Sequence, residues 1–256
     1  SPHWSDRIHI VSDPPVKRPG DDASHWLVTK IDASLRGARE AVLLVSPYFV
    51  PGDDTTDLFV EQAAAGRHVG VVTNSLAAND VAAVHGGYSK YRKRLLAGGV
   101  HLYELRPEAA RAEAADAGTG DGDAGEAGDD RAPARRGGGS GSGSSTGSSG
   151  ASLHTKAFVV DDRYGFVGSF NIDPRSIDLN TEMGVVFEDV PLALALREEY
   201  MRLSGGEKSY WVYLDEDERL RWLDRAADPP QVLDHEPESG LGARMLARLV
   251  GWLPVE

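Results

Sequence analysis

The spacing of apolar positions from residue 22 onward alternates between the helical type and the strand type. Residues 22–37 place apolar side chains at helical spacing after a cap at Asp22 or Ser24, and residues 41–46 form a short apolar run typical of a buried strand. The pattern then predicts, in order, a helix at 53–66, a strand at 68–73, a helix at 81–96 and a strand at 100–105. Strands separated by helices of this length indicate a sheet covered by helices on both faces.

This pattern stops at residue 107. Between 107 and 150 the chain has no aromatic residue and no aliphatic one larger than Ala, and from 137 to 150 every residue is Gly or Ser except Thr146. We expect 107–150 to be a disordered insert, because it cannot bury enough apolar surface to offset its ordering entropy. The chain thereby divides into a lead-in segment (1–20), one domain (21–106 with 151–234), the insert and an amphipathic C-terminal segment (235–256).

Beyond the insert the strand pattern resumes. It predicts a hairpin of 157–160 with 165–167, a strand at 183–187, a helix at 191–203, and a second hairpin of 210–214 with 219–223. Residues 8–11 also have the pattern of a strand. Together these elements predict one α/β domain with a mixed, mostly parallel sheet flanked by helices on both faces.

Composition narrows the function classes. The 256 residues include 27 Lys and Arg against 40 Asp and Glu, a net charge of −13, which disfavours binding to bulk nucleic acid. The chain has no Cys, which excludes disulfides, cysteine-ligated zinc and a thiol nucleophile. The longest apolar stretch, 41–50, is too short for the roughly 20 residues of a membrane span. Because the chain opens on Ser1 without a signal-peptide pattern, we expect an excised or processed chain.

Four polar residues carry the candidate chemistry. His154 and Lys156 are two apart on a predicted strand, so both side chains leave the same face, and Ser169 and Asn171 have the same relation on the next strand. An imidazole is a nucleophile or proton carrier, an ammonium neutralises anionic oxygens, and hydroxyl and amide groups hold the remaining oxygens. The combination predicts a phosphate site that needs no metal or other cofactor.

The spacing of these residues resembles the signature of the phospholipase D superfamily. That signature, His-x-Lys-x4-Asp-x6-Gly-Ser-x-Asn, is matched at every position, and Glu182 stands where the family has an acidic residue after the Asn. The catalytic residues that the resemblance implies are His154, Lys156, Asp161, Ser169, Asn171 and Glu182. It further implies that Glu182 orients a catalytic histidine, and that Asp161 supports structure rather than touching substrate.

Within the superfamily, the chain is similar to bacterial cardiolipin synthases. The resemblance rests on phrases such as Ser-Pro-Tyr-Phe-Val-Pro-Gly at 46–52 and Asn-Ile-Asp-Pro-Arg-Ser at 171–176. It implies a phosphatidyltransferase with a phosphohistidine intermediate, a substrate like phosphatidylglycerol, and a cytoplasmic location with peripheral contact to the inner face of the cell membrane. Such enzymes carry the motif twice, whereas here it occurs once, so we expect a C-terminal half that needs a missing N-terminal half or a homodimer. Whether His154 is nucleophile or general acid stays open.

Two other functions remain open alongside the transferase. One is a hydrolytic phospholipase D or a nuclease working as a homodimer, and the other is a non-catalytic half that serves as a scaffold. A basic island of Lys90, Arg92, Lys93, Arg94 and Arg106 is either a headgroup site or a solvated helix face. Similarly, Tyr48 and Phe49 either line a lipid entrance or lie in the core, and the helical pattern of 241–253 fits a membrane interface or a docked helix.

Overall fold

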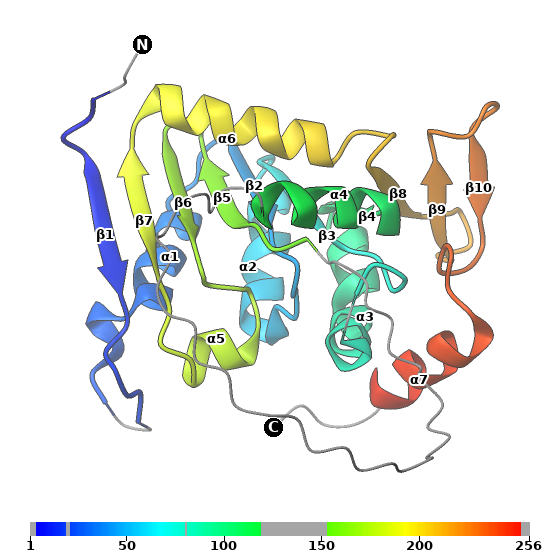
Figure 1. Cartoon of the computed structure of the whole chain (residues 1–256), viewed down its shortest axis with the longest axis horizontal. Coiled ribbons are helices and arrows are strands. Elements are labelled where there is room, and N and C mark those ends of the chain that lie inside the picture. Colours follow the sequence, from blue (N-terminus) through cyan, green and yellow to red (C-terminus); the bar gives the residue numbers. More distant parts are fainter. Residues whose placement is uncertain (1–3, 19–20, 80, 119–152, 252–256) are drawn as a thin grey trace, which may run out of the picture.

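The computed structural model describes residues 4–18, 21–79, 81–118 and 153–251, and these form one ten-stranded sheet with helices on both faces (Figure 1). The strands are β1 (Ile8–Ser12), β2 (Ala41–Val45), β3 (His68–Asn74), β4 (His101–Leu105), β5 (Lys156–Val160), β6 (Tyr164–Gly168), β7 (Met183–Glu188), β8 (Ser209–Leu214), β9 (Leu220–Asp224) and β10 (Gln231–Leu233). The helices are η1 (Ala23–His25), α1 (Leu27–Arg36), α2 (Gly52–Ala64), α3 (Ala82–Ala97), α4 (Pro107–Gly118), α5 (Pro174–Asp178), α6 (Val190–Leu203) and α7 (Leu241–Gly251).

The sheet is mixed, as the pattern predicted, but the expectation that parallel pairs would predominate is wrong. The strand order is β1-β7-β6-β5-β2-β3-β4-β8-β9-β10. Among these strands only β2–β3 and β3–β4 pair in parallel, and the other pairings are antiparallel. The reason is connectivity. The neighbouring strands β2, β3 and β4 are joined by crossovers through α2 and α3, whereas a tight turn between β5 and β6 enforces an antiparallel pair.

Strand β2 shows how the sheet separates two cores. Val42 and Leu44 belong to a core with α1, α2 and α3, whereas Leu43 and Val45 belong to a second core with α4 and α6. All four side chains are buried because each face of the strand carries helices. Figure 1 shows α6 and α4 in front of the sheet and α1 to α3 behind it.

The prediction of a disordered insert starting at residue 107 is wrong for its first part. Residues 107–118 form α4, which begins with Pro107, and Ala109 and Ala110 are buried in the second core. An alanine-rich segment needs little packing to form a helix, and its small side chains fit closely against the sheet. The remainder of the insert, 119–150, lies outside the described residues.

Some elements extend the predicted domain. The predicted strand at 8–11 is confirmed as β1, which pairs antiparallel with β7 and so joins the lead-in segment to the sheet. The short helix α5 and strand β10 carry no clear period in the sequence and were not predicted. Among the described residues, no helix is long and apolar enough to cross a membrane.

Candidate active site

Apart from Asp161, the predicted site residues lie at one edge of the sheet, around the ends of β5, β6 and β7. Lys156 opens β5 and lies opposite Gly168, the last residue of β6, which in turn lies opposite Gly184 in β7. Ser169 and Asn171 follow β6 and Glu182 precedes β7, so three short connections meet at this edge. The sequence placed His154, Ser169 and Asn171 on strands, but all three lie just beyond the strand ends.

The position of Gly168 leaves no space for a side chain, because β7 and the core lie directly against it. A Cβ on Gly168 would collide with the carbonyl oxygen of Met183 and with the ring of Phe166, which is 2.6 Å from its position. The glycine of the motif therefore lets the backbone of Ser169 approach β7. Ser169 Oγ receives a hydrogen bond from the Met183 amide at 3.0 Å as a result.

His154 and Lys156 contact each other directly. The Lys156 ammonium donates to the backbone oxygen of His154 at 2.8 Å and lies 3.2 Å from His154 Nδ1. Lys156 is buried, whereas His154 is exposed. A cation is thus held at the base of an imidazole that faces outward, which is an arrangement suited to binding an anionic group next to a reactive nitrogen.

Glu182 is buried at this edge, and its carboxylate accepts hydrogen bonds from side chains that lie nearby in the sequence. Its Oε2 accepts from Ser169 Oγ, and its Oε1 accepts from Ser176 Oγ at 2.8 Å and from Asn180 Nδ2 at 3.1 Å. These donors hold the carboxylate in one orientation. None of them is His154, so the structure does not join Glu182 to the histidine of its own motif.

Asn171 offers a buried polar group without a hydrogen-bond partner. Its side-chain Oδ1 has none among the described residues, while its backbone N–H donates to Ser176 Oγ at 3.3 Å. Next to it, Asp173 caps α5 by accepting from the Ser176 amide at 3.0 Å. Burial raises the pKa of Asp173, and the neighbouring Glu182 adds to that rise. The side-chain oxygen of Asn171 is therefore a buried acceptor with no hydrogen-bond partner among the described residues.

Asp161 lies apart from the other motif residues, at the opposite end of β5. It occupies the turn to β6 with a positive φ of 53°, a conformation that Asp tolerates better than most residues. Its carboxylate accepts from the backbone amides of Arg39, Glu40 and Ala41 at 2.9, 2.8 and 2.9 Å. These hydrogen bonds anchor the backbone at the start of β2.

A buried ion pair beneath the site was missed by sequence reasoning. Lys17 Nζ lies 2.6 Å from Asp13 Oδ2 and donates to the backbone oxygens of Ser176 and Ile177 at 2.9 and 3.0 Å. Asp13 also accepts from the Glu182 amide at 3.1 Å, and its own amide donates to the Glu182 oxygen at 2.8 Å. The segment after β1 therefore supports Glu182 and α5 directly. The spacing of an acid and a base four residues apart in a loop gave no signal of this role.

The loop after β2 closes the site from the other side. Ser46 Oγ accepts a hydrogen bond from the Ile172 amide at 3.3 Å, and the Val50 amide donates a hydrogen bond to the Ile172 backbone oxygen at 2.7 Å. Phe49 is fully buried and stacks on Phe59, so it belongs to the core and does not line a lipid entrance. The loop at 46–52 thus holds the segment between Asn171 and α5 in place.

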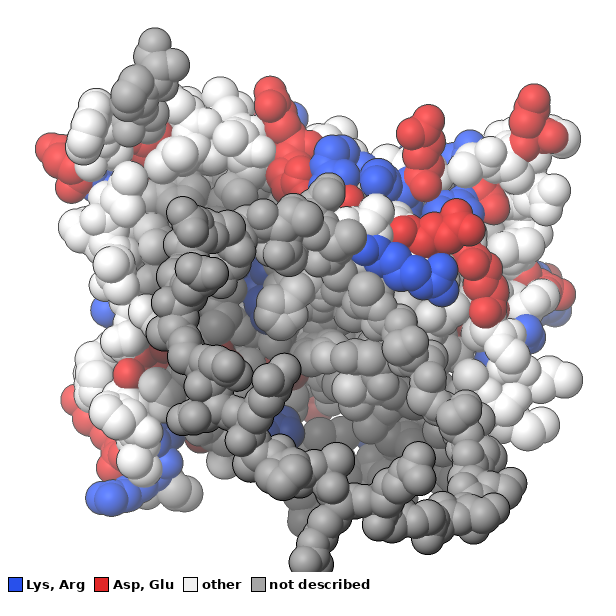
Figure 2. All heavy atoms as spheres, in the orientation of Figure 1, with Lys and Arg blue, Asp and Glu red and all other residues white. Residues whose placement is uncertain are grey.

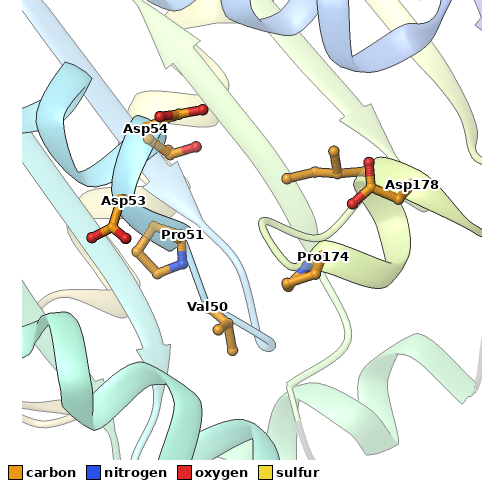
Figure 3. A pocket seen from close by; sticks show the side chains of 9 residues that line it. Val50, Pro51, Asp53, Asp54, Pro174 and Asp178 are labelled. Atoms are coloured by element: carbon orange, nitrogen blue, oxygen red, sulfur yellow. The ribbon is translucent and has the colours of Figure 1, made fainter. Parts of the chain in front are cut away.

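A cavity of about 380 Å³ lies beside this loop, between the start of α2 and α5. Figure 3 shows Asp53 and Asp54 on one side of it and Asp178 on the other. Carboxylates on both sides would repel a phosphodiester, so this cavity does not suit the substrate that the motif predicts. Among the described residues, no group of acidic or histidine side chains is arranged to hold a metal ion.

The predicted basic island does not form one surface. Arg92 is buried, where it pairs with Glu236 at 2.8 Å and lies 3.4 Å from Glu104, while Arg94 and Arg106 pair with aspartates. Burial opposes the charge, but these two carboxylates raise the pKa of Arg92. Figure 2 shows the opposite face of the sheet, where basic and acidic side chains are interleaved over α4 and α6. The island is therefore largely neutralised by partners that lie far away in sequence.

Comparison with known proteins agrees with the motif. The family model described as "Cardiolipin synthase, PLD-like domain" matches residues 140–204. The chain has a phospholipase D-like domain. The chain is 36% identical to cardiolipin synthase C of Escherichia coli over 99% of its own length. The matched region makes up 48% of that synthase. It is also 26% identical over 191 residues to cardiolipin synthase A of Cronobacter sakazakii, of which it spans 29%.

Solved structures show the same fold. The phospholipase D family member Nuc from Salmonella typhimurium superimposes with a TM-score of 0.51 at 12% identity, covering 80% of this chain and 97% of Nuc. Phosphatidylserine synthase from Haemophilus influenzae gives a TM-score of 0.52 at 14% identity, covering 95% of this chain and 44% of the synthase. The phospholipase D-like domain therefore corresponds to almost all of Nuc and to about half of the longer synthase chain.

Proposed function

We propose that this chain is one half of a phosphatidyltransferase of cardiolipin synthase type that acts through a phosphohistidine intermediate. The observation that carries the proposal is the contact between His154 and Lys156 at the same sheet edge as Asn171. Lys156 is placed to neutralise the non-bridging phosphoryl oxygens, and Asn171 to hydrogen-bond the bound lipid. The similarity to cardiolipin synthase C favours a lipid substrate over other phosphodiesters.

The proposed reaction has two displacements at phosphorus. A histidine nitrogen attacks the phosphorus of one phosphatidylglycerol, so that an N–P bond forms while the P–O bond to the leaving glycerol breaks. A second histidine protonates the leaving oxygen. The hydroxyl of another phosphatidylglycerol then attacks the phosphohistidine and gives its proton to that second histidine, and the N–P bond breaks as cardiolipin forms.

The second histidine would come from a partner half or from a second copy of this chain. The donors around Glu182 belong to its own chain and hold the carboxylate ready to orient a histidine that arrives from outside. Leu179 and Met183, on either side of Glu182, are 71% and 55% exposed. A partner half seated over this edge would bury both side chains and complete the site.

Hydrolysis is the second candidate, since water in place of the acceptor hydroxyl gives phosphatidic acid from the same intermediate. The likeness in fold to Nuc, of which the chain covers 97%, supports the view that one such domain is enough to make a whole chain, and two copies of it would supply two histidines. A net charge of −13 weighs against a nucleic acid as the substrate.

The test is incubation of the chain in chelator with labelled phosphatidylglycerol, alone and with a supplied first-half fragment, followed by lipid analysis and trapping of acid-labile phosphohistidine. Cardiolipin formed only with the fragment supports a split-site transferase, whereas phosphatidic acid as the main product supports hydrolysis. Vesicle binding with no product under either condition would contradict both and leave a scaffold.

A further inference from the structure

Helix α7 carries its apolar side chains in an unusual direction. It packs on α3, and Ala247 is buried in the contact, whereas Leu241, Met245 and Leu246 are 71%, 69% and 50% exposed. An amphipathic helix of a globular domain ordinarily turns its large apolar residues toward the core. Here the small Ala247 is buried, whereas the three large apolar side chains described at residues 241–247 are exposed, so this exposed face of α7 is suited to contact something else.

Basic side chains adjoin this outer face. A cavity of about 480 Å³ between α3, the start of β9 and α7 is lined by Lys93, Arg219, Arg221 and Arg244, with Leu241 and Met245 at α7. Lys93 forms no ion pair with a described residue, and Arg244 bonds the neutral Ser239. Two acidic residues also line the cavity, Asp234 and Glu236, and Glu236 pairs with Arg92, which also lies 3.4 Å from Glu104.

The partners of Arg219 and Arg221 are aspartates in the turn before β9. Arg219 lies 3.1 Å from Asp217 and Arg221 lies 2.7 Å from Asp215. The pair at Arg219 is largely exposed, so solvent screens it and the arginine can turn to another anion at little cost. Lys93 and Arg244, which form no ion pair with a described residue, and the screened Arg219 therefore border the exposed apolar face of α7.

The position of α7 relates this surface to the active site. Figure 1 shows α7 at the lower edge of the molecule, and α5, which follows Asn171, lies at the same edge. A planar surface in contact with α7 would thus lie on the side of the sheet at which the motif residues gather.

We propose that the outer face of α7 docks the chain on an anionic phospholipid surface. Leu241, Met245 and Leu246 enter the boundary between headgroups and acyl chains, and Lys93, Arg219 and Arg244 meet the lipid phosphates. Apolar and cationic groups side by side complement such a surface in both respects. The inference rests on the proposed function for the lipid class, and it adds the part of the fold that makes the contact.

The test is flotation of the full chain with vesicles, without turnover. The chain should float with vesicles of phosphatidylglycerol and phosphatidylcholine in equal parts, weakly with phosphatidylcholine alone, and less well as salt rises. The variant M245E/L246E should bind the anionic vesicles about tenfold more weakly. The matched control is L194E/M201E, which changes two exposed residues of α6 and should bind as the native chain does.

Three results would overturn the docking proposal. They are equal binding to both kinds of vesicle, unchanged binding by M245E/L246E, and dissociation of a lipid-free dimer by M245E/L246E, which would assign the face to a second copy. The proposed function fails separately, because His154→Ala removes the reacting group far from α7 in sequence and should leave flotation unchanged. A chain that floats but forms no product retains the docking surface and loses the transferase.

Discussion

The ammonium of Lys17 lies 2.6 Å from the carboxylate of Asp13, and neither side chain has any exposed surface. The pair joins the segment after β1 to α5 and to Glu182, because Lys17 donates to the Ser176 backbone oxygen and Asp13 accepts from the Glu182 amide. A buried pair of this kind is costly to break from one side, since the remaining charge loses its partner. Glu182 is therefore held in place through a contact between residues far apart in sequence.

Replacing Lys17 by Met should lower the free energy of unfolding by about 3–5 kcal/mol, because Asp13 is left buried without its counter-charge. Urea unfolding measures the loss. The matched control is Arg36→Met, which removes an exposed partner of Asp32 at the same sequence spacing and should change stability little. Equal effects of the two substitutions would show that the buried pair does not support the fold.

His154→Ala should reduce turnover by about 10³-fold or more while the far-ultraviolet circular dichroism and the unfolding midpoint stay unchanged. The expectation follows from exposure, since removing an outward-facing imidazole leaves no cavity. His9→Ala, at an exposed position of β1, is the control and should keep full turnover. Retained phosphohistidine in the His154 variant would mean that another residue forms the intermediate.

Glu182→Gln should lower kcat by about 10²–10⁴-fold with little change in KM, because an amide cannot stabilise the protonated form of the histidine that we propose it orients. The amide oxygen still accepts from Ser176 and Asn180, so the fold should persist. The pH profile of kcat separates this role from a structural one, and an unshifted profile with unchanged kcat would leave Glu182 only a structural task.

Gly168→Ala should destabilise the domain by about 1–3 kcal/mol, because the added Cβ meets the Met183 backbone and the Phe166 ring. Thermal unfolding measures the effect. Gly240→Ala is the control, since nothing lies within 4 Å of a Cβ at that position. If both alanine variants unfold alike, the close approach of β6 to β7 does not constrain the motif glycine.

Acid should weaken the contact between α3 and the segment before α7. Burial opposes the charge on Glu236, yet Arg92 lowers the pKa of that carboxyl from 4.5 to about 2. A carboxyl with a lower pKa in the folded state contributes stability that is present above pH 4.5 and is lost as the pH falls toward 2. Glu236→Gln should therefore flatten the stability profile in this window, whereas the exposed Glu216→Gln should not. A profile of equal slope in both variants would contradict the shift.

The sequence by itself determined the elements and the chemistry of the edge. Helical spacing in 22–37 and the apolar run of 41–46 predicted α1 and β2, because local periodicity reports which face of an element is buried. The spacing of His154, Lys156, Ser169 and Asn171 predicted that these side chains would converge. The pairing of Lys156 with Gly168 brings the backbone segments that carry them to the same end of the sheet, although three of the residues stand just outside the strands. Their catalytic roles stay predictions.

Only the tertiary structure decided how distant segments meet. The antiparallel pairing of β5 with β2, the support of Glu182 by Lys17 and Asp13, and the burial of Arg92 between Glu104 and Glu236 all join residues that no local period relates. The sequence showed α7 to be amphipathic, but its outward apolar face depends on which side packs on α3. Local patterns record which residues avoid water, whereas the partners of a buried charge or of a helix face are set by chain topology.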